Sequence, residues 1–117
     1  LDTTANPRLY GLIAEIDAKP VGSTLYYFGY NTNTTRWVLH AQDVFVDEAY
    51  RGQGIGEALF KQLARIALAR ECSWIELEVF DWNEGAQNFY KRLGMTLEES
   101  MQKMYLESEA LNKLALS

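Results

Sequence analysis

The sequence predicts an α/β fold, because strand-type and helix-type segments alternate along the chain. Apolar runs of strand type occupy residues 9–16, 21–30, 36–46 and 74–80. After the third run, apolar residues recur at i, i+4, i+7 and i+8, the spacing of one helix face: Leu59, Leu63, Ile66 and Ala67. With 117 residues, 48% of them hydrophobic, the chain has room for one core, so we expect a single domain over residues 1–117.

The elements follow from local signals in chain order. Residues 17–20, with Asp17 and Pro20, predict a hairpin turn between the first two strands. A polar loop at 31–35 precedes the strand at 36–46, and a helix then runs to about residue 71. After the strand at 74–80 we expect a short helix at 85–93, a last short strand at 101–106 and one or two helical turns at 108–116.

A glycine-rich stretch joins the third strand to the first helix. It follows the apolar residues Val44, Phe45 and Val46. Closely spaced glycines let the backbone curl around a ligand, and a helix N-terminus offers unpaired N–H groups to an anion. The spacing matches neither a P-loop nor a dinucleotide fingerprint. A pyrophosphate site is therefore predicted, with a plain helix-capping turn as the alternative, at Arg51, Gly52, Gln53, Gly54, Ile55, Gly56 and Glu57.

A second motif follows the strand at 74–80. Asn83 is a suitable N-cap and Gly94 a suitable terminator for a helix on which Ala86, Phe89 and Tyr90 recur at helical spacing. The two motifs follow one another in the order R-x-x-G-x-G (residues 51–56) and N-x-x-A-x-x-F-Y-x-x-x-G (residues 83–94). In this ordered pair the chain resembles the GNAT superfamily of acyl-CoA-dependent N-acetyltransferases. Within it, the chain looks most like the diamine (spermidine/spermine) acetyltransferase branch.

This resemblance implies a bent, mixed sheet with flanking helices, in which two parallel strands splay apart. The domain is expected to lack the strand and two helices with which the family's fold begins. It implies acetyl-CoA as co-substrate, a small primary amine as acceptor and a homodimer. The backbone of Val44, Phe45 and Val46 would bind the pantetheine arm, the glycine loop the pyrophosphate, and Asn83 and Ala86 the other side of the CoA arm. Tyr90 would protonate the departing thiolate; core packing is its alternative role.

The acceptor side departs from the branch. The polyamine enzymes carry an acidic residue where this chain has Gln42, which can hydrogen-bond an amine but cannot take its proton. Asp43 and Glu99 are the other expected substrate contacts, although Glu98 and Glu99 also fit a solvated turn. Aromatic residues on the second strand fit either the amine site or cross-strand pairs, and we leave both open: Tyr26, Tyr27 and Tyr30.

The composition of the chain argues against several kinds of partner. A net charge of −5 argues against nucleic acid, and the chain shows neither a membrane-length apolar run nor a secretory leader. Cys72 is the single cysteine, so we expect a buried structural thiol and a cytoplasmic protein. His40 lacks neighbouring His or Cys residues, so no metal is expected. A CoA-binding or interaction module without catalysis is the alternative function.

Overall fold

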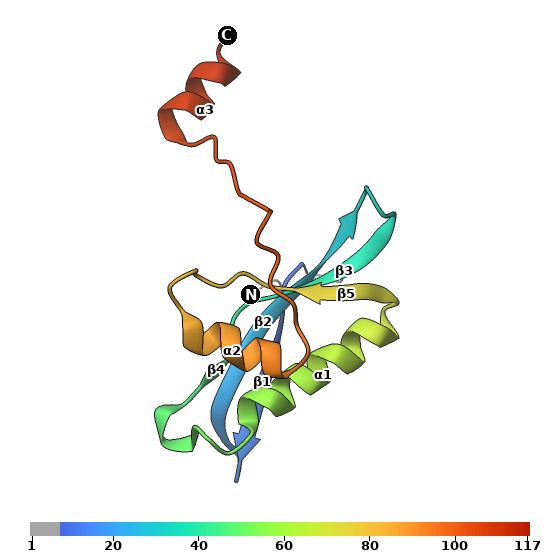
Figure 1. The fold of residues 1–117 in the computed structure, drawn as a ribbon, viewed down its shortest axis with the longest axis vertical. Helices are drawn as coiled ribbons and strands as arrows, with labels where there is room; N and C mark the ends of the chain where they lie inside the picture. The colour runs from blue at the N-terminus through green and yellow to red at the C-terminus, as the bar shows by residue number, and fades with distance from the viewer. Residues whose placement is uncertain (1–7) are drawn as a thin grey trace. The chain divides into compact units, whose positions relative to one another are not determined.

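The computed structural model describes residues 8–117, which form two compact units (Figure 1). The first extends to Glu84 and the second begins at Gly85. The first unit holds the sheet and a long helix, and the second holds two shorter helices.

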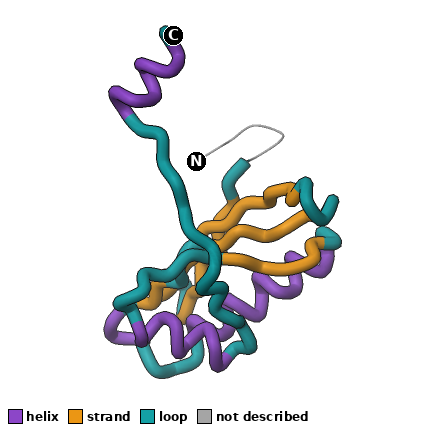
Figure 2. Tube along the Cα trace, turned by 45° about the horizontal axis from the view of Figure 1, so that its top comes forward, coloured by secondary structure: helices purple, strands orange, loops and turns teal. Residues whose placement is uncertain are grey.

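The sheet has the order β1-β2-β3-β5, with β4 paired to β2 beside β3. The first three strands are antiparallel, and β5 lies parallel to β3. Figure 2 shows the strands as one layer with α1, a helix over Ile55–Ala69, running along it. The strands are β1 (Tyr10–Ile16), β2 (Lys19–Asn31), β3 (Arg36–Ala41), β4 (Phe45–Val46) and β5 (Cys72–Glu76).

The predicted hairpin between β1 and β2 is confirmed. Asp17 and Ala18 form its turn with φ angles of 51° and 65°. Positive φ at two successive turn residues matches the right-handed twist of the strands on either side. The turn pairs Ile16 with Lys19, and a register shift between Ala14 and Glu15 then places Tyr10 opposite Tyr26.

The single strand expected at 36–46 is divided in two by a β-bulge. Ala41 pairs with Tyr26 and Phe45 pairs with Ser23. Between these two pairs lie the three residues 42–44 on one side and only the two residues 24 and 25 on β2. Gln42 still donates its N–H to the Leu25 carbonyl at 2.8 Å. Residues 43 and 44 therefore lie opposite Thr24 alone, an irregularity that apolar patterning does not reveal.

The strand expected at 74–80 begins and ends earlier, as β5. Its ladder with β3 starts at Trp37 opposite Cys72 and ends at His40 opposite Glu76. Beyond that pair β3 enters the bulge, and β4 continues on β2 instead. The parallel strands thus part after Glu76, as the expected splayed sheet requires.

Helix α1 contributes one apolar face to the core. Its buried residues follow the predicted apolar face, with Ile66 less buried and Phe60 added: Leu59, Phe60, Leu63 and Ala67. Leu39 of β3 and Leu63 of α1 are both fully buried, at 0% exposure. The helix begins one residue after Gly54 and ends near Glu71, as predicted.

The second unit contains α2 (Glu84–Arg92), apart from its first residue, and α3 (Ser108–Ala115). Gly94 ends α2 with a φ of +105°, while the Met95 N–H bonds to the Tyr90 carbonyl, so the predicted terminator is confirmed. The prediction of a strand at 101–106 is wrong. This segment is extended, but it pairs with no strand that the structure describes, and Met104 is 96% exposed (Figure 1). Apolar content alone does not make a strand without a neighbouring ladder.

Candidate active site

The glycine loop forms the sharp connection from β4 to α1. Gly52 and Gly54 both adopt a φ of +80°, the left-handed region that favours glycine. The first helical bond joins the Ala58 N–H to the Gly54 carbonyl at 3.0 Å. The amides of Ile55, Gly56 and Glu57 precede this bond and belong to the turn whose N–H groups have no intrahelical acceptor. The loop thus has the backbone geometry of an anion site.

The space around the loop is open. A Cβ built on Gly52 or Gly54 meets no protein atom within 4 Å, so a ligand can approach this backbone closely. Arg51 is held at the start of the loop because its Nε donates to the Val46 carbonyl at 3.1 Å. The loop backbone is therefore open to a ligand, with Arg51 anchored at its start.

A close contact between α1 and β2 positions the loop. A Cβ on Gly22 would lie 3.0 Å from Ile55 Cγ2 and 3.0 Å from the Phe45 carbonyl oxygen. Because Gly22 has no side chain, the first turn of α1 can lie this close to β2, next to β4. The sequence analysis missed this role of Gly22, because it depends on which strand the helix packs against.

The bulge is fixed by a buried hydroxyl. Thr24 is buried, and its Oγ1 donates to the Gln42 carbonyl at 2.9 Å. Gln42 and Asp43, two of the expected substrate contacts, are both exposed at this point. Bulges re-aim side chains beside functional sites, and this one sits where β3 and β5 part. No sequence signal identified Thr24, whose role comes from its partner 18 residues away.

The three tyrosines on β2 form cross-strand pairs. Tyr26 stacks on Tyr10 with ring centroids 5.3 Å apart, Tyr27 stacks on His40 at 4.7 Å, and Tyr30 meets Trp37 edge-on at 5.2 Å. Burial raises the pKa of Tyr26, an effect that nearby Arg70 opposes. Of the two roles left open for these residues, the structure therefore shows cross-strand packing.

His40 and Glu76 form a polar cluster on the sheet face opposite α1. His40 Nδ1 lies 3.7 Å from Glu76 Oε2, and the other carboxylate oxygen accepts a bond from Trp74 Nε1 at 2.7 Å. The two residues are the last pair of the β3–β5 ladder. The sequence analysis considered His40 only as a metal ligand and did not consider Glu76.

Tyr90 and Glu99 belong to the second unit. Tyr90 is 3% exposed, and its ring lies edge-on to Phe89 with centroids 5.1 Å apart. Glu98 accepts bonds from both the backbone N–H and the hydroxyl of Ser100, which lower the pKa of its carboxyl. Glu98 is thus part of a local turn, and Glu99 is exposed beside it.

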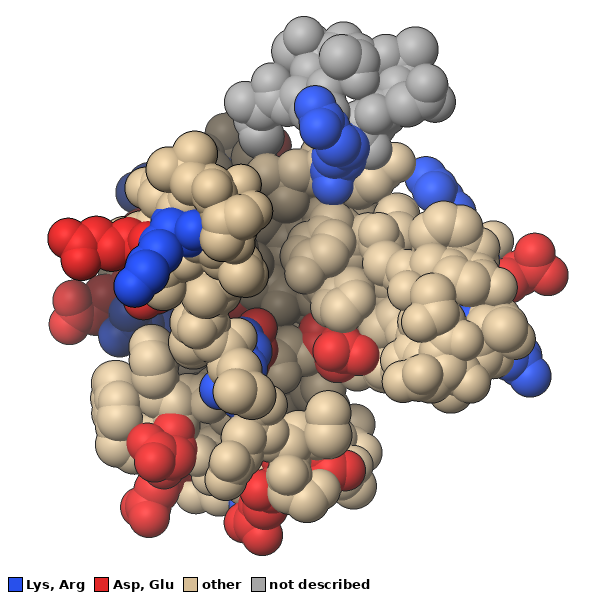
Figure 3. Space-filling view, turned by 90° about the horizontal axis from the view of Figure 1, so that it is seen from above, with Lys and Arg blue, Asp and Glu red and all other residues tan. Residues whose placement is uncertain are grey.

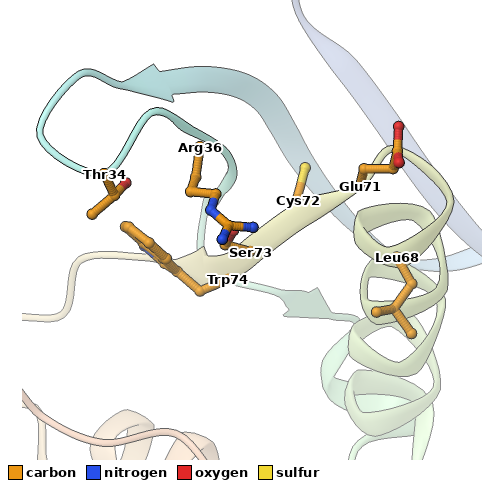
Figure 4. A pocket seen from close by; sticks show the side chains of 7 residues that line it. All are labelled: Thr34, Arg36, Leu68, Glu71, Cys72, Ser73 and Trp74. Atoms are coloured by element: carbon orange, nitrogen blue, oxygen red, sulfur yellow. The ribbon is translucent and has the colours of Figure 1, made fainter.

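A separate hollow of about 700 Å³ lies at the other end of β5 (Figure 4). Cys72 lies at its base and is buried and free, as predicted, and burial raises the pKa of its thiol. None of the predicted site residues takes part in the lining, which consists of Thr34, Arg36, Leu68, Glu71, Cys72, Ser73 and Trp74.

The distribution of surface charge, candidate membrane helices and candidate metal ligands were compared over the same residues. Figure 3 shows a face on which acidic and basic side chains are interspersed rather than gathered by sign. Within residues 8–117, no helix has the length and apolar character to cross a membrane, and no three His, Cys, Asp or Glu side chains gather as metal ligands do.

Comparisons with known proteins agree with this geometry. Residues 1–95 match the GNAT family of acetyltransferases. Thialysine N-epsilon-acetyltransferase of Mus musculus is 42% identical over 121 residues, covering 94% of this chain and 71% of that enzyme. Spermidine/spermine N(1)-acetyltransferase-like protein 1 of Homo sapiens is 38% identical over 96 residues, covering 76% of this chain and 14% of that protein.

Among solved structures, an integron cassette protein from the mobile metagenome of V. cholerae superposes with a TM-score of 0.84 at 29% identity, covering 97% of this chain and 70% of that one. The predicted superfamily and fold are thereby confirmed, and so is the resemblance to the diamine branch. The chain belongs to the GNAT family of N-acetyltransferases, enzymes that use acetyl-CoA as co-substrate.

Proposed function

We propose that the chain transfers the acetyl group of acetyl-CoA to a primary amine of a small molecule, either a diamine or polyamine or an amino-acid-like amine. The amine attacks the thioester directly while both substrates are bound. The observation that carries this proposal is the loop at Gly52 and Gly54, which is left-handed, open above the backbone and continuous with the N-terminus of α1.

The cofactor side of the proposal uses backbone groups. Fixed amides of the loop from Arg51 to Glu57, Gln53 included, would bind the pyrophosphate, because peptide N–H groups need no change of protonation to hold an anion. Val44, Phe45 and Val46 would present strand-edge groups to the pantetheine amides. Asn83 and Ala86, at the beginning of α2, would contact the same arm.

We assign the leaving-group proton to Tyr90. A thiolate needs a proton as the C–S bond breaks, and a positioned phenol hydroxyl can supply it. The buried ring of Tyr90 and the register of the Phe89-Tyr90 pair with the superfamily motif support this assignment. Packing alone would also bury the ring, so the hydroxyl is the group to test.

The acceptor would be held by Gln42, Asp43 and Glu99. Relatives are named for acetylating thialysine at its ε-nitrogen and for spermidine and spermine, which points to amines on flexible chains. Gln42 lacks the negative charge that would select a second ammonium group, so a compact amino-acid-like amine fits this chain better than a polyamine.

A homodimer is part of the proposal. Helix α3 exposes Leu111 and Leu114, and Leu116 directly after the helix is exposed as well, an apolar surface that a second copy could cover. Sedimentation of the chain with and without residues 108–117 tests this directly: loss of the dimer on truncation is expected, and an unchanged monomer in both cases contradicts it.

A turnover screen tests the main proposal. Purified protein is incubated with acetyl-CoA and a panel that includes spermidine, lysine and its thioether analogue, ornithine and simple diamines. Acetylated amine is measured by mass spectrometry together with CoA thiol release. Acetylation of at least one amine is expected; acetyl-CoA binding without turnover of any amine would instead identify a CoA-binding module.

A further inference from the structure

We propose that Lys19, the first residue of β2, binds the 3′-phosphate on the ribose of acetyl-CoA, so that the protein prefers this thioester to the form that lacks that phosphate. The inference rests on the proposed function and adds to its cofactor side a residue that lies outside both sequence motifs. It concerns residues of the first unit only.

Lys19 lies beside the start of the glycine loop. It directly follows the hairpin turn at residues 17–18. From there its Nζ lies over the Tyr50 ring, 5.7 Å from the ring centroid. Tyr50 immediately precedes Arg51, where the loop begins. Figure 1 shows the β1–β2 turn and the segment between β4 and α1 at the same end of the sheet.

Backbone bonds to β2 hold Tyr50 in place. Tyr50 is the last residue of η1, a short 3₁₀-helix over Glu48–Tyr50. Its N–H donates to the Asp47 carbonyl at 2.8 Å, and the Asp47 N–H donates to the Val21 carbonyl at 2.8 Å. Val21 and Lys19 belong to the same strand. The ammonium group and the ring beneath it are therefore both positioned by β2, next to the loop.

The ammonium group of Lys19 keeps its hydrogen-bond donors available. The face of an aromatic ring attracts a cation and so orients the side chain, without accepting a conventional hydrogen bond from it. Within residues 8–117, Lys19 forms no hydrogen bond or ion pair with another side chain or carbonyl. Arg51, by contrast, uses its Nε on the Val46 carbonyl. Lys19 thus offers an oriented positive charge whose N–H donors can meet a ligand.

The chemistry of acetyl-CoA indicates which group this charge would meet. The molecule carries a pyrophosphate, which the loop amides would bind, and a phosphate monoester one sugar ring further on. A phosphate monoester carries a charge of about −1.5 to −2 at pH 7. The lysine ammonium is a compact charge with rotatable donors on a flexible stem, which can follow such a group in several orientations. Lys19 therefore fits the monoester, while the loop backbone fits the pyrophosphate.

Titration calorimetry on the full chain tests the proposal with two ligands, acetyl-CoA and acetyl-3′-dephospho-CoA. The wild-type protein should bind acetyl-CoA about 5- to 20-fold more tightly, between the effect of an exposed ion pair and that of a charged hydrogen bond. In Lys19→Gln the Kd for acetyl-CoA should rise by this factor while the Kd for the dephospho ligand stays constant. Because Lys19 is exposed, this variant should fold. Binding is measured without an amine, so the result does not depend on turnover.

Further variants separate the charge from its orientation. Lys19→Arg keeps a positive charge and should keep most of the preference. Tyr50→Leu keeps the lysine but removes the ring beneath it, so part of the preference should be lost. Arg65→Gln is the matched control, because it removes one exposed positive charge from α1 about 16 Å along the helix from Gly54. It should leave the ratio of the two Kd values unchanged, and thermal melting checks that each variant is folded.

Each outcome decides between the alternatives. No preference in the wild type, an unchanged preference in folded Lys19→Gln, or an equal loss of affinity for both ligands overturns the role of Lys19. The proposed function is then still upheld if the turnover screen yields an acetylated amine. A wild-type protein that binds neither thioester contradicts the proposed function, and this inference fails with it.

Discussion

Substitution of Gly54 separates the shape of the proposed pyrophosphate loop from the stability of the protein. Gly54 adopts a φ of 80° and a ψ of 11° at the start of α1. A side chain in this left-handed region costs roughly 1–2 kcal/mol for most residues and less for Asn, which tolerates it. Because a Cβ at Gly54 meets no protein atom within 4 Å, it adds no clash inside the protein.

The added side chain instead enters the space where the phosphate is expected. Displacing the anion from one backbone N–H removes a charge-assisted hydrogen bond of about 1.5–3 kcal/mol. The Kd for acetyl-CoA should therefore rise about 10- to 100-fold in Gly54→Asn, measured by titration calorimetry. Its Tm should fall by no more than about 4 °C, the shift that roughly 1 kcal/mol produces in a domain of this size. In Gly54→Val, β-branching adds backbone strain, so Tm should fall further.

A glycine outside the loop supplies the control. Gly94 also has a positive φ, 105°, and open space at its Cβ position. Gly94→Asn should lower Tm at least as much as Gly54→Asn while acetyl-CoA affinity stays at the wild-type value. A folded Gly54→Asn protein that binds acetyl-CoA as tightly as the wild type would refute the assignment of the loop.

Three further outcomes are expected. Tyr90→Phe should lower single-turnover acetylation about 10²–10⁴-fold with unchanged acetyl-CoA affinity, and near-normal rates would leave Tyr90 a packing residue. Gln42→Glu should raise kcat/KM for spermidine relative to a lysine analogue about 10- to 100-fold, and a constant ratio would place amine selection elsewhere. Burial raises the pKa of Cys72 above its ordinary 9.0, so on raising pH the unfolded state loses the thiol proton first. The free energy of unfolding should therefore decline above pH 9.0, as followed by urea titration, and Cys72→Ala should remove this part of the decline.

Local signals predicted the elements that depend on local chemistry. The hairpin at Asp17 and Ala18, the helix after Gly54 and the end of α2 at Gly94 were all foreseen, because turn and helix-end preferences act within a few residues. The glycine loop belongs to the same group. Its left-handed residues are glycines, so both its position and its shape could be expected from the sequence.

Strand limits could not be predicted in the same way. A strand lasts only as long as its neighbour offers a ladder, which is why β5 ends at Glu76, and why the apolar residues at 101–106 form none. The division of the 36–46 segment has the same origin. Thr24 holds the bulge through the Gln42 carbonyl, a contact between two strands that no single segment contains.

The sequence by itself determined the family, the alternation of elements and the glycine loop before α1, because these depend on residue order within one βα unit. Only the tertiary structure decided that Gly22 lets α1 lie against β2, that the β2 tyrosines form cross-strand pairs, and that His40 meets Glu76. These contacts depend on register between strands, and a shift of one residue would turn every one of these side chains to the other face of the sheet.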